Sequence, residues 1–491
     1  MSSLILIIPI LVPIIGGYLI IPLGFKNRKV RDAYAMAVVC ITSILTWICL
    51  WKVGIVSATL YSFTRGFSID LRADEPARLF AVMVSLMWPL VMLYAFEYMS
   101  HTKRGNSFFA FYVMTYGVTL GVAFSANMTT LYMFYDLLSL VTIPLVTHYA
   151  DHESSFAGRK YAAYTIGGAS LAFFAVVMTS IYNGAGNFLY GGNLYGPYDP
   201  GLMQLVFLFG FFGFGVKAAV FPLHSWLPTA SVAPTPVTAL LHAVAVVNTG
   251  VFAIMRLAWY TYGPDFLKGT LCLKIAQAFA VFTLVYAACL AVKQRHFKRR
   301  LAFSTISNLS YMLFGILLMT PEGLEAGLLH MVFHGIIKIT LFMCAGAFMH
   351  ETMHSYVYEI NGVGRKMPVT FAMYTISALS LVGIPGLCGF ISKLHLVLGG
   401  LEEGSALAVI GSAALMLSAF LCAIYTLSVS VRAFFPMEGT DRYIGADDYV
   451  AKEVGALMLL PICTFTLVNV IFGLFPGPLT SFIEKMAWGI F

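Results

Sequence analysis

Apolar runs of about 20 residues recur along almost the whole chain, and this feature constrains the fold more than any other. A helix of roughly 20 apolar residues crosses a bilayer core about 30 Å thick. The runs give fourteen candidate spans: 3–24, 31–52, 77–100, 108–126, 127–149, 160–183, 202–227, 235–260, 269–292, 300–320, 323–350, 368–398, 404–431 and 453–477. The sequence therefore predicts an all-α polytopic membrane protein with about 14 transmembrane helices.

The composition excludes several other classes of protein. Of the 491 residues, 59% are hydrophobic and 10% are charged, whereas soluble domains carry about 25% charged residues. A soluble enzyme, a nucleic-acid-binding module and a disordered chain are all incompatible with these values. No CxxC pair, phosphate loop or dinucleotide fingerprint occurs, so we expect no cofactor and no bound metal. Alternating residues in 53–76 predict a short hairpin outside the membrane.

Lysine and arginine are distributed unevenly between the two sides of the predicted membrane. The loops that follow odd-numbered spans hold 18 of the 29 basic residues, and the opposite side holds 7. Basic loops stay in the cytoplasm. This asymmetry predicts that both termini lie on the outer side. Four basic residues fall inside predicted spans: Lys217, Arg256, Lys338 and Lys393.

Charged side chains in mid-span are the strongest functional signal. Asp136, Lys217, Lys338 and Lys393 lie in apolar spans, where each charge costs about 2.5–3.5 kcal/mol on an insertion scale. One acid cannot neutralise three lysines, so two lysines lack an acidic mate in the membrane. Such a lysine can take up and release a proton near neutral pH. A proton relay is therefore favoured over the alternative, a buried ion pair that only fixes helix packing.

Histidines extend this titratable set. His330 and His334 precede Lys338 at i, i+4 and i+8, which places the three side chains on one stripe of a helix. His242 lies in another span, and His224 follows Pro222. A single histidine on an apolar face is more often an ordinary core residue, but three aligned titratable groups favour a relay. His330 and His334 also have a zinc-ligand spacing, although no further ligand is apparent.

Two prolines interrupt the long spans 202–227 and 368–398. Pro222 and Pro385 each lie near a lysine, and a broken helix is tolerated in lipid only where it faces protein or a wet cavity. Packing kinks are one explanation. Similar breaks in two halves otherwise indicate repeated units with a path at the midplane. We predict N-terminal helices in 1–107, inverted five-helix repeats in 108–260 and 269–431, and a cytoplasmic loop with a last span in 432–491.

Four stretches carry a family resemblance: "VKAAVFPLHSWLPTASVAPTPVTALLHAVAVVNTGVFAIMR", "RRLAFSTISNLSYMLFGI", "GLLHMVFHGIIKITLFMCAGA" and "GIPGLCGFISKLHLV". They resemble the proton-translocating antiporter-like subunits of respiratory complex I, Mrp-type multisubunit sodium/proton antiporters and energy-converting membrane-bound hydrogenases. The resemblance covers roughly 65–430 and implies fourteen helices with two inverted five-helix repeats. It also implies a prokaryotic plasma membrane, neighbouring antiporter-like and other membrane subunits, a peripheral redox arm, and H⁺ or Na⁺ as the transported ion.

The resemblance assigns roles to particular residues. It implies an acid–lysine pair of Asp136 and Lys217, a central relay at His242, and a terminal lysine at Lys393. His330, His334 and Lys338 complete the relay. From the sequence itself we expect His224 and Asn248 as accessory groups.

Three positions depart from the family pattern. Asp136 replaces a glutamate, Asn248 stands where many relatives have a lysine, and Thr229 replaces an aspartate. The shorter Asp136 carboxylate needs a water or a backbone shift to reach Lys217, and the central relay depends on His242 or is interrupted.

We expect a proton- or Na⁺/H⁺-translocating subunit that is not catalytic by itself and is driven by redox chemistry or by another ion gradient. "LLHAVAVVNTGVF" in a compact chain favours a hydrogenase-type or Mrp-type complex. A stand-alone cation/proton transporter, and a scaffold whose path is inactivated at Asn248 and Thr229, stay open. An intramembrane zinc protease is a further alternative, because His350, Glu351 and His354 form an HExxH motif.

Overall fold

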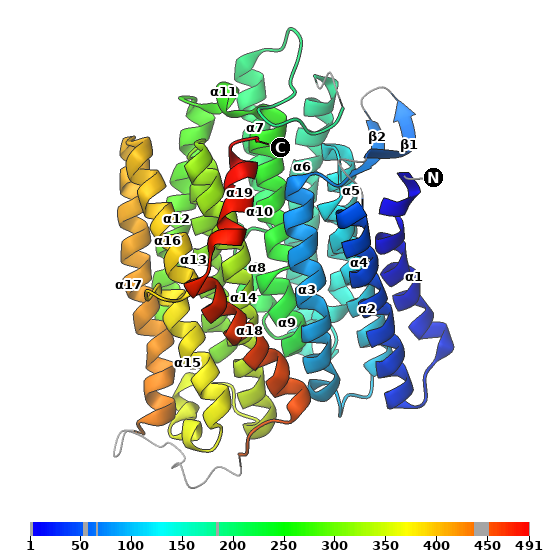
Figure 1. Ribbon diagram of the computed structural model, residues 1–491, viewed down its shortest axis with the longest axis vertical. Helices are drawn as coiled ribbons and strands as arrows, with labels where there is room; N and C mark the ends of the chain where they lie inside the picture. Colours follow the sequence, from blue (N-terminus) through cyan, green and yellow to red (C-terminus); the bar gives the residue numbers. More distant parts are fainter. Residues whose placement is uncertain (1–2, 53–56, 65–66, 183–185, 437–450, 491) are drawn as a thin grey trace.

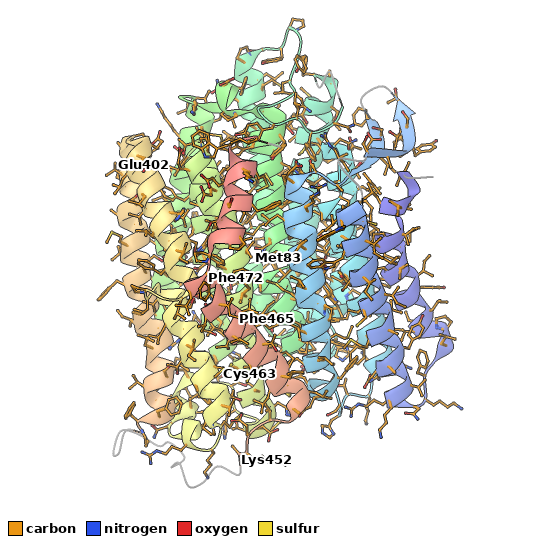
Figure 2. All side chains as sticks on the ribbon, in the orientation of Figure 1. Met83, Glu402, Lys452, Cys463, Phe465 and Phe472 are labelled. Carbon is orange, nitrogen blue, oxygen red and sulfur yellow. The ribbon has the colours of Figure 1, made fainter. Side chains whose placement is uncertain are left out.

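The computed structural model describes residues 3–52, 57–64, 67–182, 186–436 and 451–490. These residues form a bundle of long helices that run along a common direction (Figure 1). The first half contains the 3₁₀ turn η1 and ten α-helices: η1 Ser3–Leu6, α1 Ile8–Leu23, α2 Arg28–Lys52, α3 Glu75–Tyr98, α4 Gly105–Ala123, α5 Met128–Val146, α6 His152–Ile181, α7 Pro200–Gly215, α8 Trp226–Ala230, α9 Thr235–Ala243 and α10 Val246–Leu257.

The second half begins with the π-helical turn η2 and continues with nine α-helices and two 3₁₀ turns: η2 Ala258–Tyr262, α11 Pro264–Leu267, α12 Leu271–Lys293, α13 Phe297–Leu317, α14 Pro321–Thr352, η3 Val357–Ile360, η4 Val363–Arg365, α15 Pro368–Val382, α16 Cys388–Glu403, α17 Ala406–Phe434, α18 Ala456–Leu474 and α19 Gly477–Ala487.

The predicted all-α polytopic fold is confirmed. Every predicted span coincides with one helix or with two helices separated by a break. Within the described residues, nine helical stretches are long and apolar enough to cross a membrane, and α1, α7 and α15 are shorter apolar helices. The number of fourteen crossings and the inverted repeats stay predictions. Residues 437–450 of the predicted cytoplasmic loop lie outside the described residues.

A β-hairpin follows α2, as the alternating residues predict. Strand β1 (Ser57–Thr64) pairs antiparallel with β2 (Phe67–Arg72) beside the N-terminus (Figure 1). The hairpin is fastened to the α4–α5 connection, because Arg72 N donates to Phe124 O at 2.7 Å and Ala126 N donates to Asp70 O at 2.9 Å. These bonds hold strand β2 against the bundle at this end.

The two predicted breaks are present, and hydrogen bonds reach backbone groups that the first break removes from the helix. Helix α7 ends at Gly215, before Pro222, and α8 begins at Trp226. The Trp226 Nε1–H donates to Val216 O at 2.7 Å, and Phe221 N donates to Thr283 Oγ1 on α12 at 3.0 Å. Between α15 and α16, Gly383 and Gly386 turn the chain with φ angles of 102° and 88°. Backbone groups in an apolar surrounding must be hydrogen-bonded, and Val216 O and Phe221 N at the first break meet this requirement.

A third break was not predicted. The span expected as one helix over 235–260 divides into α9 and α10 between Ala243 and Val246. Asn248 Nδ2 on α10 donates to Ala243 O at the end of α9, at 2.8 Å. Neither proline nor glycine occupies positions 244 and 245. The expectation of a continuous helix was therefore wrong. The interruption is stabilised by the Asn248 side chain and not by a helix-breaking residue.

Helix α14 lies in the centre of the molecule. The apolar stretch of α14 that is long enough to cross a membrane is entirely buried. Thr320 caps the first turn of the helix, because its hydroxyl accepts from Gly323 N at 3.1 Å. The helix contacts α3, α9, α13, α15, α16, α18 and α19. Helix α19, which the sequence did not predict, follows α18 and lies against α14 near the C-terminus (Figure 1). This position puts His330, His334 and Lys338 in the interior.

We predict that Gly389→Ala destabilises the second break by about 1–3 kcal/mol, as overpacking does. A Cβ atom at Gly389 would lie 2.0 Å from Ser380 O, which is backbone and cannot yield easily. Gly399→Ala on the same helix is the control, because its Cβ would meet nothing closer than 3.6 Å. Thermal unfolding of both purified variants measures the difference. Equal melting temperatures for the two variants would contradict the packing described for this break.

Candidate functional site

Lys217 occupies the first break, just after α7, and its side chain is fully buried. Its ammonium donates to the backbone carbonyl of Tyr135 on α5. The same Nζ lies 3.7 Å from the centroid of the Tyr135 ring. The break also touches α10, because a Cβ at Gly250 would lie 2.4 Å from Ala218 N. Lys217 is thus held where α5, α7 and α10 meet.

Asp136 follows Tyr135 on α5 and is half-buried. Although Lys217 bonds to the neighbouring residue Tyr135, Asp136 and Lys217 form no ion pair within 4.0 Å, and Asp136 Oδ1 has no hydrogen-bond partner among the described residues. The lysine is instead bonded to a neutral carbonyl and an aromatic face. The carboxylate can therefore act on Lys217 through its electric field without a direct hydrogen bond.

Lys338 on α14 is fully buried and bonds to α13. Its Nζ donates to Ser304 Oγ at 2.6 Å and to Leu301 O at 3.2 Å. The Ser304 hydroxyl also shares a 2.8 Å hydrogen bond with Tyr425 Oη on α17. Lys338 therefore has only neutral partners in the described residues, as expected for a lysine without an acidic mate.

The two histidines on α14 have different surroundings. His330 bridges two helices, with Nδ1 2.9 Å from Ser392 Oγ on α16 and Nε2 3.1 Å from Asn308 Oδ1 on α13. His334 is fully buried, and neither ring nitrogen has a partner among the described residues. The ring centroids are 6.0 Å apart. Within the described residues no group of three His, Cys, Asp or Glu could hold a metal ion, so a zinc site at this pair has no geometric support.

Lys393 lies on α16, just beyond the second break. Its Nζ donates to Leu381 O at 2.5 Å and to Val382 O at 3.1 Å, the last carbonyls of α15. The Tyr311 ring centroid is 5.2 Å away. A helix C-terminus carries partial negative charge and stabilises a cation. Lys217 and Lys393 thus have the same kind of environment: a broken helix, backbone carbonyl oxygens and a tyrosine face.

Hydrogen bonds connect Lys338 to His330 through α13, and His330 and Lys393 both contact the ring of Tyr311. Asn308, which bonds to His330, donates from Nδ2 to Ser304 O at 2.7 Å, and Ser304 bonds to Lys338. At the other end, the Tyr311 ring lies 5.3 Å from the His330 ring and faces Lys393. The described hydrogen bonds do not continue from Lys338 to Lys217. Each half therefore contains a break with its lysine, and the second half also contains hydrogen bonds that join Lys338 to His330.

The remaining predicted residues lie around the first break. His242 is on α9, and its side chain is outside the described part of the structure. His224 faces the rings of Phe221 and Tyr286, and its Nδ1 has no partner in the described residues. Asn248 bridges α9 and α10. Thr229 Oγ1 accepts from Lys160 Nζ at 3.1 Å.

One buried ion pair was missed by the sequence reasoning. Arg256 on α10 is bidentate to Asp74, with Nη1 2.8 Å from Oδ2 and Nη2 2.5 Å from Oδ1. The guanidinium is fully buried between the rings of Phe188, Phe252 and Tyr260. Asp74 also caps α3 by accepting from Ala77 N at 3.1 Å. Two sequence signals were available: an arginine inside an apolar span, and an aspartate directly before a helix that begins "EPARLF".

The HExxH motif does not form a metalloprotease site. Helix α14 ends at Thr352, and Met353 is left-handed with φ 60°, so His354 is not one helical turn beyond His350. His350 Nδ1 lies 3.3 Å from Glu351 Oε1, and His354 Nδ1 lies 3.4 Å from Glu359 Oε1. The zinc protease alternative therefore has no geometric support.

The fold and the site define a polytopic membrane protein whose interior carries titratable side chains on interrupted helices. A family model described as "NADH:quinone oxidoreductase/Mrp antiporter, TM" matches residues 125–431. The chain belongs to this family. The expected family resemblance is thereby confirmed.

Three curated relatives illustrate the range of this family. The chain is 32% identical to F(420)H(2) dehydrogenase subunit L of Methanosarcina mazei, over 84% of this chain and 64% of the relative. It is 30% identical to NADH-quinone oxidoreductase subunit N of Desulforudis audaxviator, over 86% and 85%. It is 29% identical to one of the Na(+)/H(+) antiporter subunits of Alkalihalophilus pseudofirmus, over 88% and 56%. The chain thus spans little more than half of that antiporter protein and less than two thirds of the dehydrogenase protein.

Solved structures have the same fold. A chain of the membrane-bound sulfane sulfur reductase, an archaeal respiratory membrane complex, has a TM-score of 0.86 at 21% identity, over 99% of this chain and 98% of that chain. A chain of the Mrp complex from Dietzia sp. DQ12-45-1b has a TM-score of 0.84 at 19% identity, over 99% and 97%. At these identities the likeness concerns the fold alone.

Proposed function

We propose that this chain is an ion-translocating, antiporter-like subunit of a multisubunit membrane complex, and that it moves protons or exchanges protons for sodium. The observation that carries the proposal is the buried polar set that joins Lys338 to His330, with Lys393 against the same Tyr311 ring as His330. A buried lysine with neutral partners can exist in charged and neutral forms, and neighbouring hydroxyl, amide and imidazole groups can pass its proton on.

Lys217 is the group that takes up the proton at the start of the path. Its ammonium rests on the Tyr135 carbonyl and ring, so a small change in the field of nearby Asp136 shifts the balance between its charged and neutral forms. Moving one charge against 100 mV costs about 2.3 kcal/mol. A change in one buried charge–charge interaction is of this order. His242, followed by Lys338 and Lys393, would carry the proton onward.

The complex and the orientation belong to the same proposal. The named relatives are subunits of a dehydrogenase, an oxidoreductase and an antiporter, which supports other membrane subunits as partners. A redox arm or a second ion gradient would supply the energy. We place the chain in a prokaryotic plasma membrane, with the basic loops in the cytoplasm and both termini outside. The preference for a hydrogenase-type or Mrp-type complex stays a prediction.

Ion uptake by the purified complex in sealed vesicles tests the function. A pH-sensitive dye reports proton movement and ²²Na⁺ reports sodium movement, with and without the electron donor of the complex. Proton movement alone supports a pump, and opposite movement of both ions supports exchange. If an active, correctly inserted complex moves neither ion, the proposal is wrong.

We expect Ser304→Ala to slow this transport about tenfold, because it removes a hydroxyl partner of Lys338 and hydrogen bonds to charged groups are worth about 1.5–3 kcal/mol. Ser307→Ala is the control. Its hydroxyl lies on the same helix but bonds to Leu284 O and Ser418 Oγ and to no titratable group. Initial rates in the vesicle assay measure both variants, and equal rates would remove Ser304 from the path.

A further inference from the structure

A cavity of about 420 Å³ lies where the end of α12, the start of α13 and the end of α17 come together. Arginine dominates its polar lining. Arg295, Arg300 and Arg432 line it together with Tyr358, Ser428 and Ile424. None of the three arginines belongs to the proposed path, and of the lining residues only Tyr425 reaches it, through the hydrogen bond of its hydroxyl to Ser304.

Arg300 is held in a fixed orientation at the cavity. Its Nε donates to Gln294 O at 2.9 Å, and its Nη1 donates to Tyr425 O and to Ser428 Oγ, both at 3.1 Å. These three bonds leave Nη2 without a partner among the described residues. A preorganised guanidinium with an unused donor is suited to bind an oxyanion.

Arg295, which is exposed, and Arg432, which is half-buried, contribute to the same cavity. Their backbone carbonyls are already used, since Val357 N donates to Arg295 O and Gly362 N donates to Arg432 O, each at 2.9 Å. None of the three guanidinium groups forms an ion pair with a carboxylate within residues 3–436 and 451–490, as far as these are described. Three like charges around one cavity repel one another, and a bound anion relieves that repulsion.

An apolar stripe leads away from the cavity along α17. Phe420, Ile424 and Val431 are exposed and share one side of the helix, and Ile424 itself lines the cavity. In a membrane helix such a stripe faces the hydrocarbon tails of lipids. The combination of an anion-binding cavity and an adjoining apolar track matches a molecule with a phosphate head and acyl chains.

We propose that this cavity binds the phosphate headgroup of an anionic phospholipid, with an acyl chain along α17. Arg300 fixes the phosphate through Nη2, and Arg295 and Arg432 neutralise its charge. The cavity lies near the end of the bundle that we assign to the cytoplasm, where anionic lipids attract basic residues with about 1 kcal/mol for each charge.

The test compares two double variants of the full-length chain in its complex. R295Q/R432Q removes two cavity charges and keeps Arg300 with its structural bonds. K26Q/K29Q removes two exposed charges in and beside the α1–α2 connection, at the same end of the bundle as the end of α17 (Figure 1). Binding of phosphatidylglycerol is measured by native mass spectrometry and by the rise in melting temperature, with phosphatidylcholine and inorganic phosphate as separate probes.

We expect phosphatidylglycerol to bind the cavity variant about 30-fold more weakly, which corresponds to two charges at about 1 kcal/mol each. The control variant should bind as the unchanged protein does. Equal binding to the cavity variant, or equal binding of phosphatidylcholine to the unchanged protein, would overturn the proposal. Stabilisation by inorganic phosphate as large as that by phosphatidylglycerol would also overturn it, because the ligand would then be free phosphate.

Discussion

Lys217→Ala is expected to abolish ion transport while the complex still assembles. The lysine is the fully buried ammonium in the first break, and alanine leaves no group there that can hold a proton. Its main contacts are the Tyr135 carbonyl and ring, so its removal breaks no ion pair on which the fold depends. Vesicle transport assays measure the loss, and co-purification of the neighbouring subunits measures assembly.

Two further variants distinguish the loss of the Lys217 charge from the loss of its side-chain packing. Lys217→Met keeps most of the side-chain volume and removes the charge, so it should be as inactive as Lys217→Ala even if the smaller residue disturbs the break. Lys293→Ala, at the exposed end of α12, should transport normally. Normal transport by Lys217→Met would reject Lys217 as a proton carrier.

Arg256→Met should lower the stability of the protein by about 3–5 kcal/mol, the cost of leaving a buried charge without its partner. Asp74 is bonded to both terminal nitrogens of Arg256 and is itself almost fully buried. The variant therefore leaves an uncompensated carboxylate between α3 and α10. Thermal unfolding of the purified complex measures the loss.

The exposed pair of Arg299 and Glu153 provides the comparison. Their side chains are 40% and 63% exposed, so Arg299→Met should cost at most about 1 kcal/mol. The double variant R256M/D74N should recover part of the lost stability, because it removes the stranded charge and an asparagine can still cap α3. If R256M and R299M melt at the same temperature, the buried pair does not stabilise the protein.

Hydropathy was sufficient to predict the helices, because each apolar run is about as long as a bilayer is thick. The breaks at Pro222 and Pro385 were predictable for a different reason, since proline cannot continue a helix. The break after Ala243 was not, because it depends on the Asn248 amide reaching a carbonyl in the folded chain. Helix α19 was missed as well, since the last predicted span ends at residue 477, where α19 begins.

The residues of the site were easier to predict than their contacts. A charge in an apolar run stands out in a sequence, so Lys217, Lys338 and Lys393 could be singled out. Their partners are backbone carbonyls, a serine hydroxyl and tyrosine rings, and such groups are too common for a sequence to mark. The Arg256–Asp74 pair joins positions far apart in the chain, and only the folded bundle brings them together.

The helices packed around α14 restrict how this protein can work. A helix surrounded on all sides cannot turn or slide as a rigid rod without displacing side chains in both halves of the molecule. We therefore expect a transport cycle in which the backbone around His330, His334 and Lys338 stays nearly still. Changes of side-chain rotamers and rearrangement of water would then open and close the proton path. Crystal structures of different states of the transport cycle would superimpose closely around α14.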